Sequence, residues 1–200
     1  MIEAHTGWTR ACCRARLSGM KKDLLTPLAA AVTMLLAPGA AHASLPVGAR
    51  APMFATQGAK GGKVLSFDLK QALRRGPVVL YFYPKAFTKG CTLEAHAFAE
   101  ASDDFDRAGA QVVGMSADDL PTLQKFSTEA CRDKFTVAVA TPKVIKGYDV
   151  ALKRDGAPAS MTDRTSYVIA PDGRIVMVHS ELDYRDHVKL TLAAVQKLKR

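Results

Sequence analysis

A continuous apolar run from Val78 to Tyr83 constrains the fold more than any other feature of this 200-residue chain. Its six successive β-branched, aliphatic and aromatic residues are closed by Pro84. Such a run is typical of a strand that is buried on both faces of a sheet. Because buried strands of this kind occur where helices cover a sheet, the run predicts a central strand in an α/β protein.

Around this run, the chain alternates helical and strand-like patterns. Residues 44–62 are rich in Pro, Gly and Ala, and they lead into an expected strand at 63–67 and a short helix at 68–75. Apolar residues recur with helical spacing from Leu93 to Ala108, which predicts one helix ended by Gly109. The later expected elements are a strand at 111–116, a helix opened by Asp118, Asp119 and Pro121 and running towards Cys131, a strand at 135–140, a helix at 142–148, a hairpin of strands at 165–170 and 174–179, and a helix at 187–198.

The order of these elements predicts an α/β fold with a mixed central sheet flanked by helices. It matches a thioredoxin-like fold with an N-terminal β extension. The sequence contains no internal repeat, low-complexity tract or internal linker. We therefore expect one folded domain, residues 44–200, which is long enough to bury a proper core.

Residues 20–43 have the order of a cleavable export signal. A positive start is followed by an apolar stretch and a small-x-small site, namely Lys21-Lys22, Leu24–Ala37 and Ala41-His42-Ala43. The apolar stretch is shorter than the roughly 20 residues that a membrane-spanning helix needs. We expect cleavage after Ala43 and a periplasmic or secreted protein without stable membrane association; an uncleaved anchor is the alternative. Because residues 1–19 precede this signal, one hypothesis is that translation starts at Met20.

The charge distribution does not indicate a nucleic-acid partner. The chain has 28 basic and 19 acidic residues and a formal net charge of +9. These charges are scattered, and no block of five or six like charges occurs, so they are typical of a solvated surface. A basic stripe with aromatic residues, or a nucleic-acid reader motif, is also missing from the sequence.

Cys91 and Cys131 are the cysteines that remain once residues 1–43, with Cys12 and Cys13, are removed. Two cysteines in an exported domain form either a structural disulfide or a redox pair. Cys91 follows the predicted central strand and lies in the first turn of the next predicted helix. Ligand sites of open α/β sheets lie at this end of the strands. The free N–H groups and the dipole of a helix start favour a thiolate, which is the nucleophilic form of cysteine.

The residues around Cys91 complete a recognisable motif. Pro84 ends the strand and can shield the sulfur from water, the hydroxyl of Thr88 can donate one hydrogen bond and accept another, and Gly90 leaves the backbone open to a small ligand. Pro84, Thr88 and Cys91 match Pro-x-x-x-Thr-x-x-Cys, the active-site motif of the peroxiredoxins. From Pro46 to Lys199, the chain resembles the bacterioferritin-comigratory (PrxQ-like) subgroup of the AhpC/TSA family.

The resemblance implies a thiol-dependent peroxidase. Cys91 would attack hydrogen peroxide or a small organic hydroperoxide and become a sulfenic acid. An arginine from a later strand completes the site in this family, and the matching residue is Arg164, whose guanidinium would stabilise the thiolate. The resemblance also implies a monomer that needs no metal or other cofactor and is recycled by a thioredoxin-like dithiol protein.

The chain departs from the subgroup at the second reactive thiol. Many PrxQ-like proteins carry a resolving cysteine five residues after the first, where this chain has His96. The resemblance to other members assigns that role to Cys131, whereas a buried or free Cys131 would make a one-cysteine enzyme. His96, His179 and His187 are interpreted as surface or capping residues without chemistry.

Three other functions have sequence requirements that can be compared with the same residues. A thioredoxin-type thiol-disulfide oxidoreductase needs Cys-x-x-Cys, but residue 94 is Glu. An exported copper carrier resembling the Sco proteins needs Cys-x-x-x-Cys, but residue 95 is Ala, so the pair of thiolates that Cu(I) favours is missing. A protein that only senses peroxide overlaps with the peroxidase and remains open.

Overall fold

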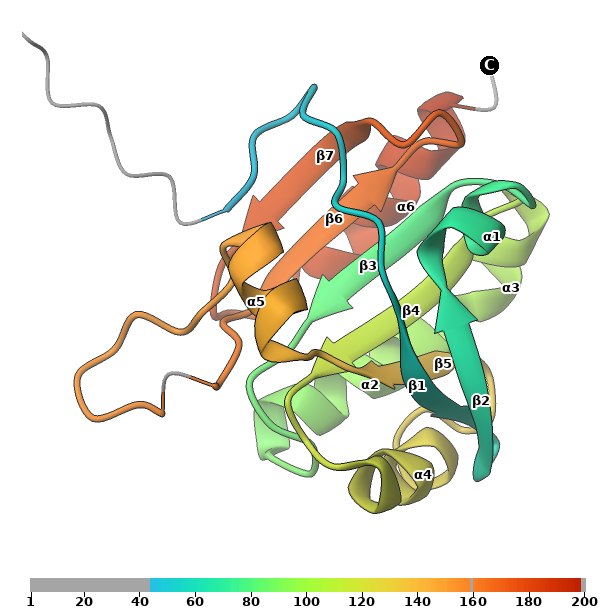
Figure 1. Ribbon diagram of the computed structural model, residues 1–200. Helices are drawn as coiled ribbons and strands as arrows, with labels where there is room; N and C mark the ends of the chain where they lie inside the picture. The colour runs from blue at the N-terminus through green and yellow to red at the C-terminus, as the bar shows by residue number, and fades with distance from the viewer. Residues whose placement is uncertain (1–43, 159, 199–200) are drawn as a thin grey trace, which may run out of the picture. The chain divides into compact units, whose positions relative to one another are not determined.

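The computed structural model describes residues 44–158 and 160–198, and a seven-stranded mixed sheet forms its centre (Figure 1). The strand order is β2-β1-β5-β4-β3-β6-β7, in which β3, β4 and β5 are parallel and the other pairs are antiparallel. The strands are β1 (Ala55–Lys60), β2 (Lys63–Asp68), β3 (Val78–Phe82), β4 (Gln111–Ser116), β5 (Thr136–Val139), β6 (Thr165–Ile169) and β7 (Ile175–Ser180). The predicted signal peptide, its cleavage site after Ala43 and the possible start at Met20 lie outside the described residues.

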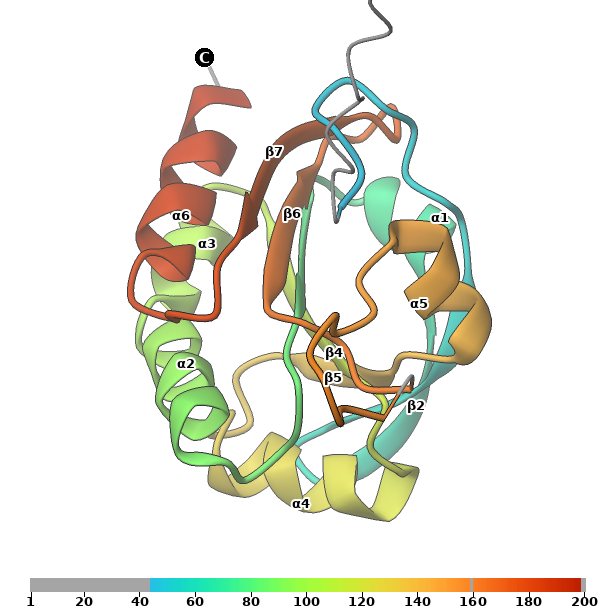
Figure 2. The ribbon, with the colours of Figure 1, turned by 90° about the vertical axis from the view of Figure 1, so that its left-hand side faces the viewer.

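Helices cover both faces of this sheet (Figure 2). One face is covered by α1 (Leu69–Leu73) and α5 (Pro142–Tyr148). The other is covered by α2 (Lys89–Glu100), α3 (Ser102–Arg107), α4 (Leu120–Glu129) and α6 (His187–Leu198). None of the helices in the described part of the chain has both the length and the apolar character needed to cross a membrane. The α/β class, the mixed sheet and the flanking helices are confirmed.

The predicted central strand is β3, which pairs with β4 on one side and β6 on the other. All five of its residues are buried. Val79 and Tyr81 belong to the apolar cluster under α2, and Leu80 and Phe82 to the cluster on the opposite face. The unbroken apolar run is therefore explained by burial on both sides of the sheet.

Two elements differ from the sequence prediction. The single helix expected from Leu93 to Ala108 is divided into α2 and α3 at Ala101, whose ψ of 0° leaves the helical range. Strand β1 was not predicted, because its sequence has no apolar alternation and it is formed by pairing with β2 and β5. At Gly58 the strands approach so closely that a Cβ atom would lie 2.5 Å from the carbonyl oxygen of Val137.

Candidate active site

The loop that joins β3 to α2 is held by hydrogen bonds at both ends. The N–H of Tyr83 donates to the carbonyl of Met115 at 3.0 Å, and its own carbonyl accepts from the hydroxyl of Thr162 at 2.7 Å. Farther along, the N–H of Ala86 donates to Oδ2 of Asp118 at 2.7 Å. Asp118 therefore anchors the loop, whereas the predicted capping role belongs to Asp119, which accepts from the first turn of α4.

Cys91 is the third residue of α2, and its side chain is 1% exposed. The guanidinium of Arg164, in the segment just before β6, lies against it: Nη2 donates to Cys91 Sγ at 3.5 Å. The same guanidinium donates from Nε to the carbonyl of Leu182 at 2.8 Å and from Nη1 to the carboxyl of Glu94. Three hydrogen bonds thus fix the orientation of the Arg164 guanidinium. They hold it against the sulfur of Cys91, which lies 73 positions earlier in the sequence.

Glu94 is a component of the site that the sequence analysis missed. It lies one helical turn after Cys91, is fully buried, and its carboxyl accepts a hydrogen bond from the Arg164 guanidinium. Burial raises the pKa of Glu94 to about 8, although Arg164 acts in the opposite direction. The i, i+3 spacing of Cys91 and Glu94 was the available signal, because residues three apart share a helix face.

The interpretation of His187 as a surface residue is wrong. His187 is fully buried at the start of α6, where its Nε2 donates to the carbonyl of Glu181 at 2.9 Å. Its Nδ1 lies 2.7 Å from the hydroxyl of Ser166, and the ring of His179 packs against it with centroids 4.5 Å apart. Burial lowers the pKa of His187 to about 4, so the ring is neutral near pH 7.

Thr88 and Pro84 lie in the loop before Cys91, but neither has a hydrogen bond to its sulfur. Thr88 is the N-cap residue of α2, and its hydroxyl donates to the carbonyl of Lys85 at 3.0 Å. Pro84 follows β3 and is partly buried. The structure thus joins Arg164 to Cys91 directly and leaves the Thr88 hydroxyl turned towards the loop.

Cys131 lies just beyond the end of α4 and is fully buried as a free thiol. Burial, with a smaller effect of Asp133, raises the pKa of Cys131, so this thiol is protonated. Cys91 and Cys131 belong to the same apolar cluster, which also contains Tyr81 and Tyr83. The hydroxyl of Tyr81 is buried and has no hydrogen-bond partner among the described residues.

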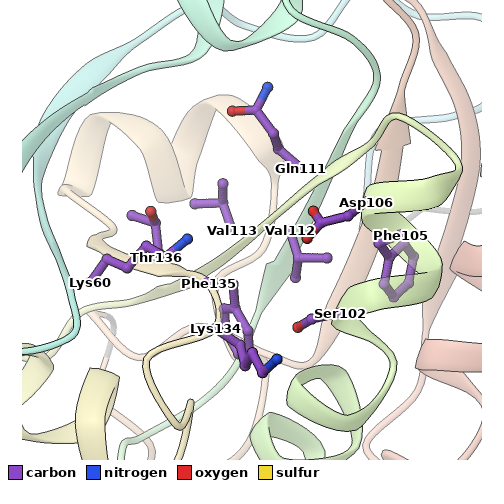
Figure 3. A pocket seen from close by; sticks show the side chains of 10 residues that line it. All are labelled: Lys60, Ser102, Phe105, Asp106, Gln111, Val112, Val113, Lys134, Phe135 and Thr136. Carbon is purple, nitrogen blue, oxygen red and sulfur yellow. The ribbon is translucent and has the colours of Figure 1, made fainter.

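Two pockets differ in their relation to this site. One, of about 280 Å³, borders Arg164 and has Leu152 and Leu182 in its wall. The other, of about 100 Å³, is shown in Figure 3 and is lined by residues from the amino ends of β4 and β5, including Gln111 and Thr136. Cys91 follows the opposite, carboxyl end of the parallel strands, so the pocket of Figure 3 is separate from the candidate site.

No metal site accompanies these residues in the described part of the chain. Residues 44–158 and 160–198 contain no group of three or more His, Cys, Asp or Glu side chains placed to hold an ion. Glu94 and His187 both have the protein partners given above.

Comparisons with known proteins converge on one family. The model of the AhpC/TSA family matches residues 47–178, a range that includes Cys91, Cys131 and Arg164. The chain is 32% identical over 154 residues to "Peroxiredoxin Q, chloroplastic" of Populus jackii, covering 74% of this chain and 68% of that protein. It is 29% identical over 157 residues to "Peroxiredoxin Bcp" of Bacillus subtilis, covering 78% and 98%. The crystal structure of peroxidoxin BcpB from Mycobacterium tuberculosis superposes with a TM-score of 0.68 at 29% identity, covering 77% of this chain and 98% of that one.

Proposed function

The chain belongs to the AhpC/TSA family and is a peroxiredoxin, and from this premise we propose that Cys91 is the residue that attacks the peroxide. One observation carries the assignment: Nη2 of Arg164 donates to Cys91 Sγ at 3.5 Å in a buried setting. A guanidinium beside a sulfur stabilises its anionic form, and the thiolate is the form that attacks.

The proposed first half-reaction consumes one peroxide. The Cys91 thiolate attacks one oxygen of ROOH, an S–O bond forms, and the O–O bond breaks. The departing oxygen takes up a proton, so a thiol and ROOH become a sulfenic acid and ROH. Arg164 would also stabilise the negative charge that develops on the peroxide oxygens.

Thr88 and Pro84 are proposed to assist this step. The Thr88 hydroxyl now donates to the carbonyl of Lys85, and rotation of its side chain would offer that hydroxyl to a bound peroxide instead. Pro84 would limit the access of water to the thiolate. The pocket beside Arg164 does not have Cys91 among its lining residues, so the proposal of hydrogen peroxide and small organic hydroperoxides as substrates rests on the resemblance to the family.

Cys131 is proposed to resolve the sulfenic acid. Its thiol would condense with the Cys91 sulfenic acid, giving a disulfide and one water, and a thioredoxin-like dithiol protein would then reduce that disulfide. A disulfide requires Cα atoms within about 7 Å, and we propose that the end of α4 opens to bring the buried thiol to Cys91. Arg132 and Asp133, directly after Cys131, have left-handed φ angles of 50° and 60°, which favours opening at this end of α4.

Mass analysis of two matched cysteine variants tests the whole cycle. One equivalent of hydrogen peroxide is expected to remove two hydrogens from the wild-type protein and to add one oxygen to Cys131→Ser. Cys91→Ser is expected to remain unmodified and to lose peroxide turnover with a dithiol reductant. Full turnover in Cys91→Ser would refute the assignment of the nucleophile, and an oxygen adduct without a disulfide in the wild type would refute Cys131 as the resolving residue.

We propose further that the enzyme is exported and acts as a monomer. The first proposal rests on the order of charged, apolar and small residues in 20–43, and the second on the resemblance to the PrxQ-like subgroup. Mass spectrometry of the exported protein is expected to find Ser44 at the N-terminus, and sedimentation one chain per particle. A mature protein that retains residues before Ser44 would contradict the cleavage site.

A further inference from the structure

The guanidinium of Arg164 contacts two groups that can each carry a negative charge, the thiol of Cys91 and the carboxyl of Glu94. Cys91 and Glu94 project from the same helix face, and both contact the guanidinium. The Glu94 carboxyl is fully buried, so water cannot solvate its charge. Two buried anions beside one cation would leave an uncompensated buried charge, which is costly. The ionisation of Glu94 and that of Cys91 therefore compete for Arg164.

The second oxygen of Glu94 faces His187. Oε2 accepts from Arg164, but Oε1 is buried without a hydrogen-bond partner and lies 3.7 Å from Nδ1 of His187. The contact is built by the packing of α2 and α6 on the same face of the sheet, where Figure 2 shows α6 above α2.

The hydrogen bonds of His187 define which of its nitrogens can accept a proton. Its Nε2 faces the carbonyl of Glu181, which can only accept, so Nε2 carries a hydrogen. The neutral ring then has its lone pair on Nδ1, to which the hydroxyl of Ser166 donates. At 3.7 Å, Oε1 of Glu94 lies beyond hydrogen-bond distance of this nitrogen, so a protonated Glu94 would move closer and compete with Ser166 to donate to the same lone pair.

We infer that Glu94 and His187 together hold one buried proton, and that this proton keeps the positive charge of Arg164 available to the sulfur of Cys91. The inference deepens the proposed peroxidase and rests on it for the role of Cys91. Glu94 and His187 act as positioning residues in this scheme, because they influence the sulfur through Arg164.

The directions of the two pKa shifts agree with this geometry. A raised pKa for Glu94 and a lowered pKa for His187 put the shared proton on Glu94 near neutral pH. Loss of that proton as the pH rises through about 8 would create a carboxylate that draws the charge of Arg164 away from Cys91. The peroxide reaction is then expected to slow at alkaline pH, the opposite of what a simple thiol does.

The other ionisable groups around the pair are few. Cys91, Arg164 and Tyr81 face Glu94, while His179, Asp183 and Arg164 face His187. Burial raises the pKa of Tyr81 well above 10, so its phenol stays neutral in this range. Burial lowers the pKa of Arg164, but an anion at Cys91 or at Glu94 outweighs that effect and keeps the guanidinium charged. The ring of His179 packs against that of His187, but His179 has no hydrogen bond to Glu94 or Arg164 in the described part of the chain, so His179→Gln is a control that changes the surroundings of His187 and leaves those two residues alone.

Infrared spectroscopy and peroxide kinetics between pH 6 and 10 test the inference in parallel. The C=O stretch of a protonated carboxyl, present in wild type and missing in Glu94→Gln, is expected to disappear near pH 8. The rate of Cys91 oxidation by hydrogen peroxide is expected to fall about tenfold over the same range, as loss of a charge-assisted hydrogen bond implies. In Glu94→Gln this alkaline decrease is expected to vanish.

Two further variants should move the transition in opposite directions. His187→Leu removes the acceptor and is expected to shift the transition to lower pH. Ser166→Ala removes the competing donor to Nδ1 and is expected to shift it to higher pH, and His179→Gln is expected to leave it in place. If His187→Leu does not fold, Ser166→Ala and Glu94→Gln decide the question.

Each outcome is decisive. Absence of the Glu94 carboxyl band at pH 6, or an alkaline decrease that persists in Glu94→Gln, would overturn the inference. A band that titrates without any change in the rate would overturn the link through Arg164. If the band titrates as expected but Cys91 shows no reaction with peroxide at any pH, the proposed function fails while the shared proton stands.

Discussion

Gly90 leaves the space that Arg164 fills: a Cβ atom at position 90 would lie 3.2 Å from Nη2 of the guanidinium. The same nitrogen donates to Cys91 Sγ. The sequence analysis assigned the space beside this glycine to a ligand, and the structure shows that the guanidinium of Arg164 occupies part of it. The absence of a side chain at position 90 therefore permits the close approach of the guanidinium to the sulfur.

Gly90→Ala is expected to slow peroxide reduction without destabilising the fold. The added methyl must displace the guanidinium by a few tenths of an ångström, whereas alanine is favoured over glycine in a helix by about 1 kcal/mol. Gly147→Ala in α5 is the matched control, because its Cβ would only make an ordinary 3.6 Å contact with Pro52. Stopped-flow rates and melting temperatures of both variants check this, and equal rates would contradict it.

Asp118→Ala is expected to lower the rate of Cys91 oxidation about tenfold. The substitution removes the acceptor for the N–H of Ala86 and so loosens the loop before the nucleophile; hydrogen bonds to charged groups contribute about 1.5–3 kcal/mol. Asp119→Ala is the control, since it removes the cap of α4 and is expected to reduce stability with little effect on the rate. The reverse pattern would show that Asp118 does not hold the loop.

Tyr81→Phe is expected to preserve or raise the free energy of unfolding. The hydroxyl of Tyr81 is buried without a partner, so its removal relieves an uncompensated polar group and leaves the ring packing intact. The hydroxyl of Tyr167, by contrast, donates to the carbonyl of Tyr148 at 2.9 Å and accepts from Leu45. Tyr167→Phe is therefore expected to cost about 1–2 kcal/mol in urea unfolding, and a loss of similar size in Tyr81→Phe would count against this account.

Glu94→Gln is expected to change how stability depends on pH. The pKa of Glu94 is raised from 4.5 to about 8 on folding, so its contribution to stability is complete below pH 4.5 and declines as the pH rises through 8. Between these values the wild-type free energy of unfolding, relative to the variant, is expected to fall by about 1 kcal/mol per pH unit. Urea unfolding of both proteins at four or more pH values measures the slope; parallel curves would mean that Glu94 ionises normally.

Arg132→Gly is expected to slow formation of the Cys91–Cys131 disulfide. Glycine adopts the left-handed φ of 50° without strain, so the closed end of α4 would gain about 1 kcal/mol and open less often. Arg132→Ala loses the same ion pair with Glu100 but retains the strain, and it is the appropriate control. Rapid-quench mass analysis after peroxide addition gives the rates, and faster disulfide formation in the glycine variant would refute the role of this turn.

The sequence predicted the central part of the fold because its signals are local. The run at Val78–Tyr83, the cap at Asp119 and the turn before Arg174 each specify an element through their own residues, and these elements were confirmed. The division at Ala101 and strand β1 were not predictable in the same way. Both depend on packing and strand pairing with distant parts of the chain, which no short sequence pattern indicates.

The residues of the candidate site also fall into those that a local sequence pattern predicts and those that only distant packing reveals. Cys91, with the loop before it, follows from a motif within ten residues of sequence. Glu94 and His187 do not, because a buried carboxyl and a buried imidazole have the same letters as the exposed ones that are far more common. Only the packing of α6 against β6 and β7 shows that His187 has no access to solvent.

In the proposed cycle, the burial of Cys131 would set a limit on how much peroxide the protein can survive. A sulfenic acid at Cys91 would persist for as long as the end of α4 stays closed, and during that interval a second peroxide molecule could convert it to a sulfinic acid, which a dithiol reductant does not restore. Resolution would be limited by the opening of one helix end, whereas the second oxidation would accelerate with peroxide concentration. Brief, low exposures would then be repaired, and sustained high exposures would inactivate the enzyme in proportion to the dose.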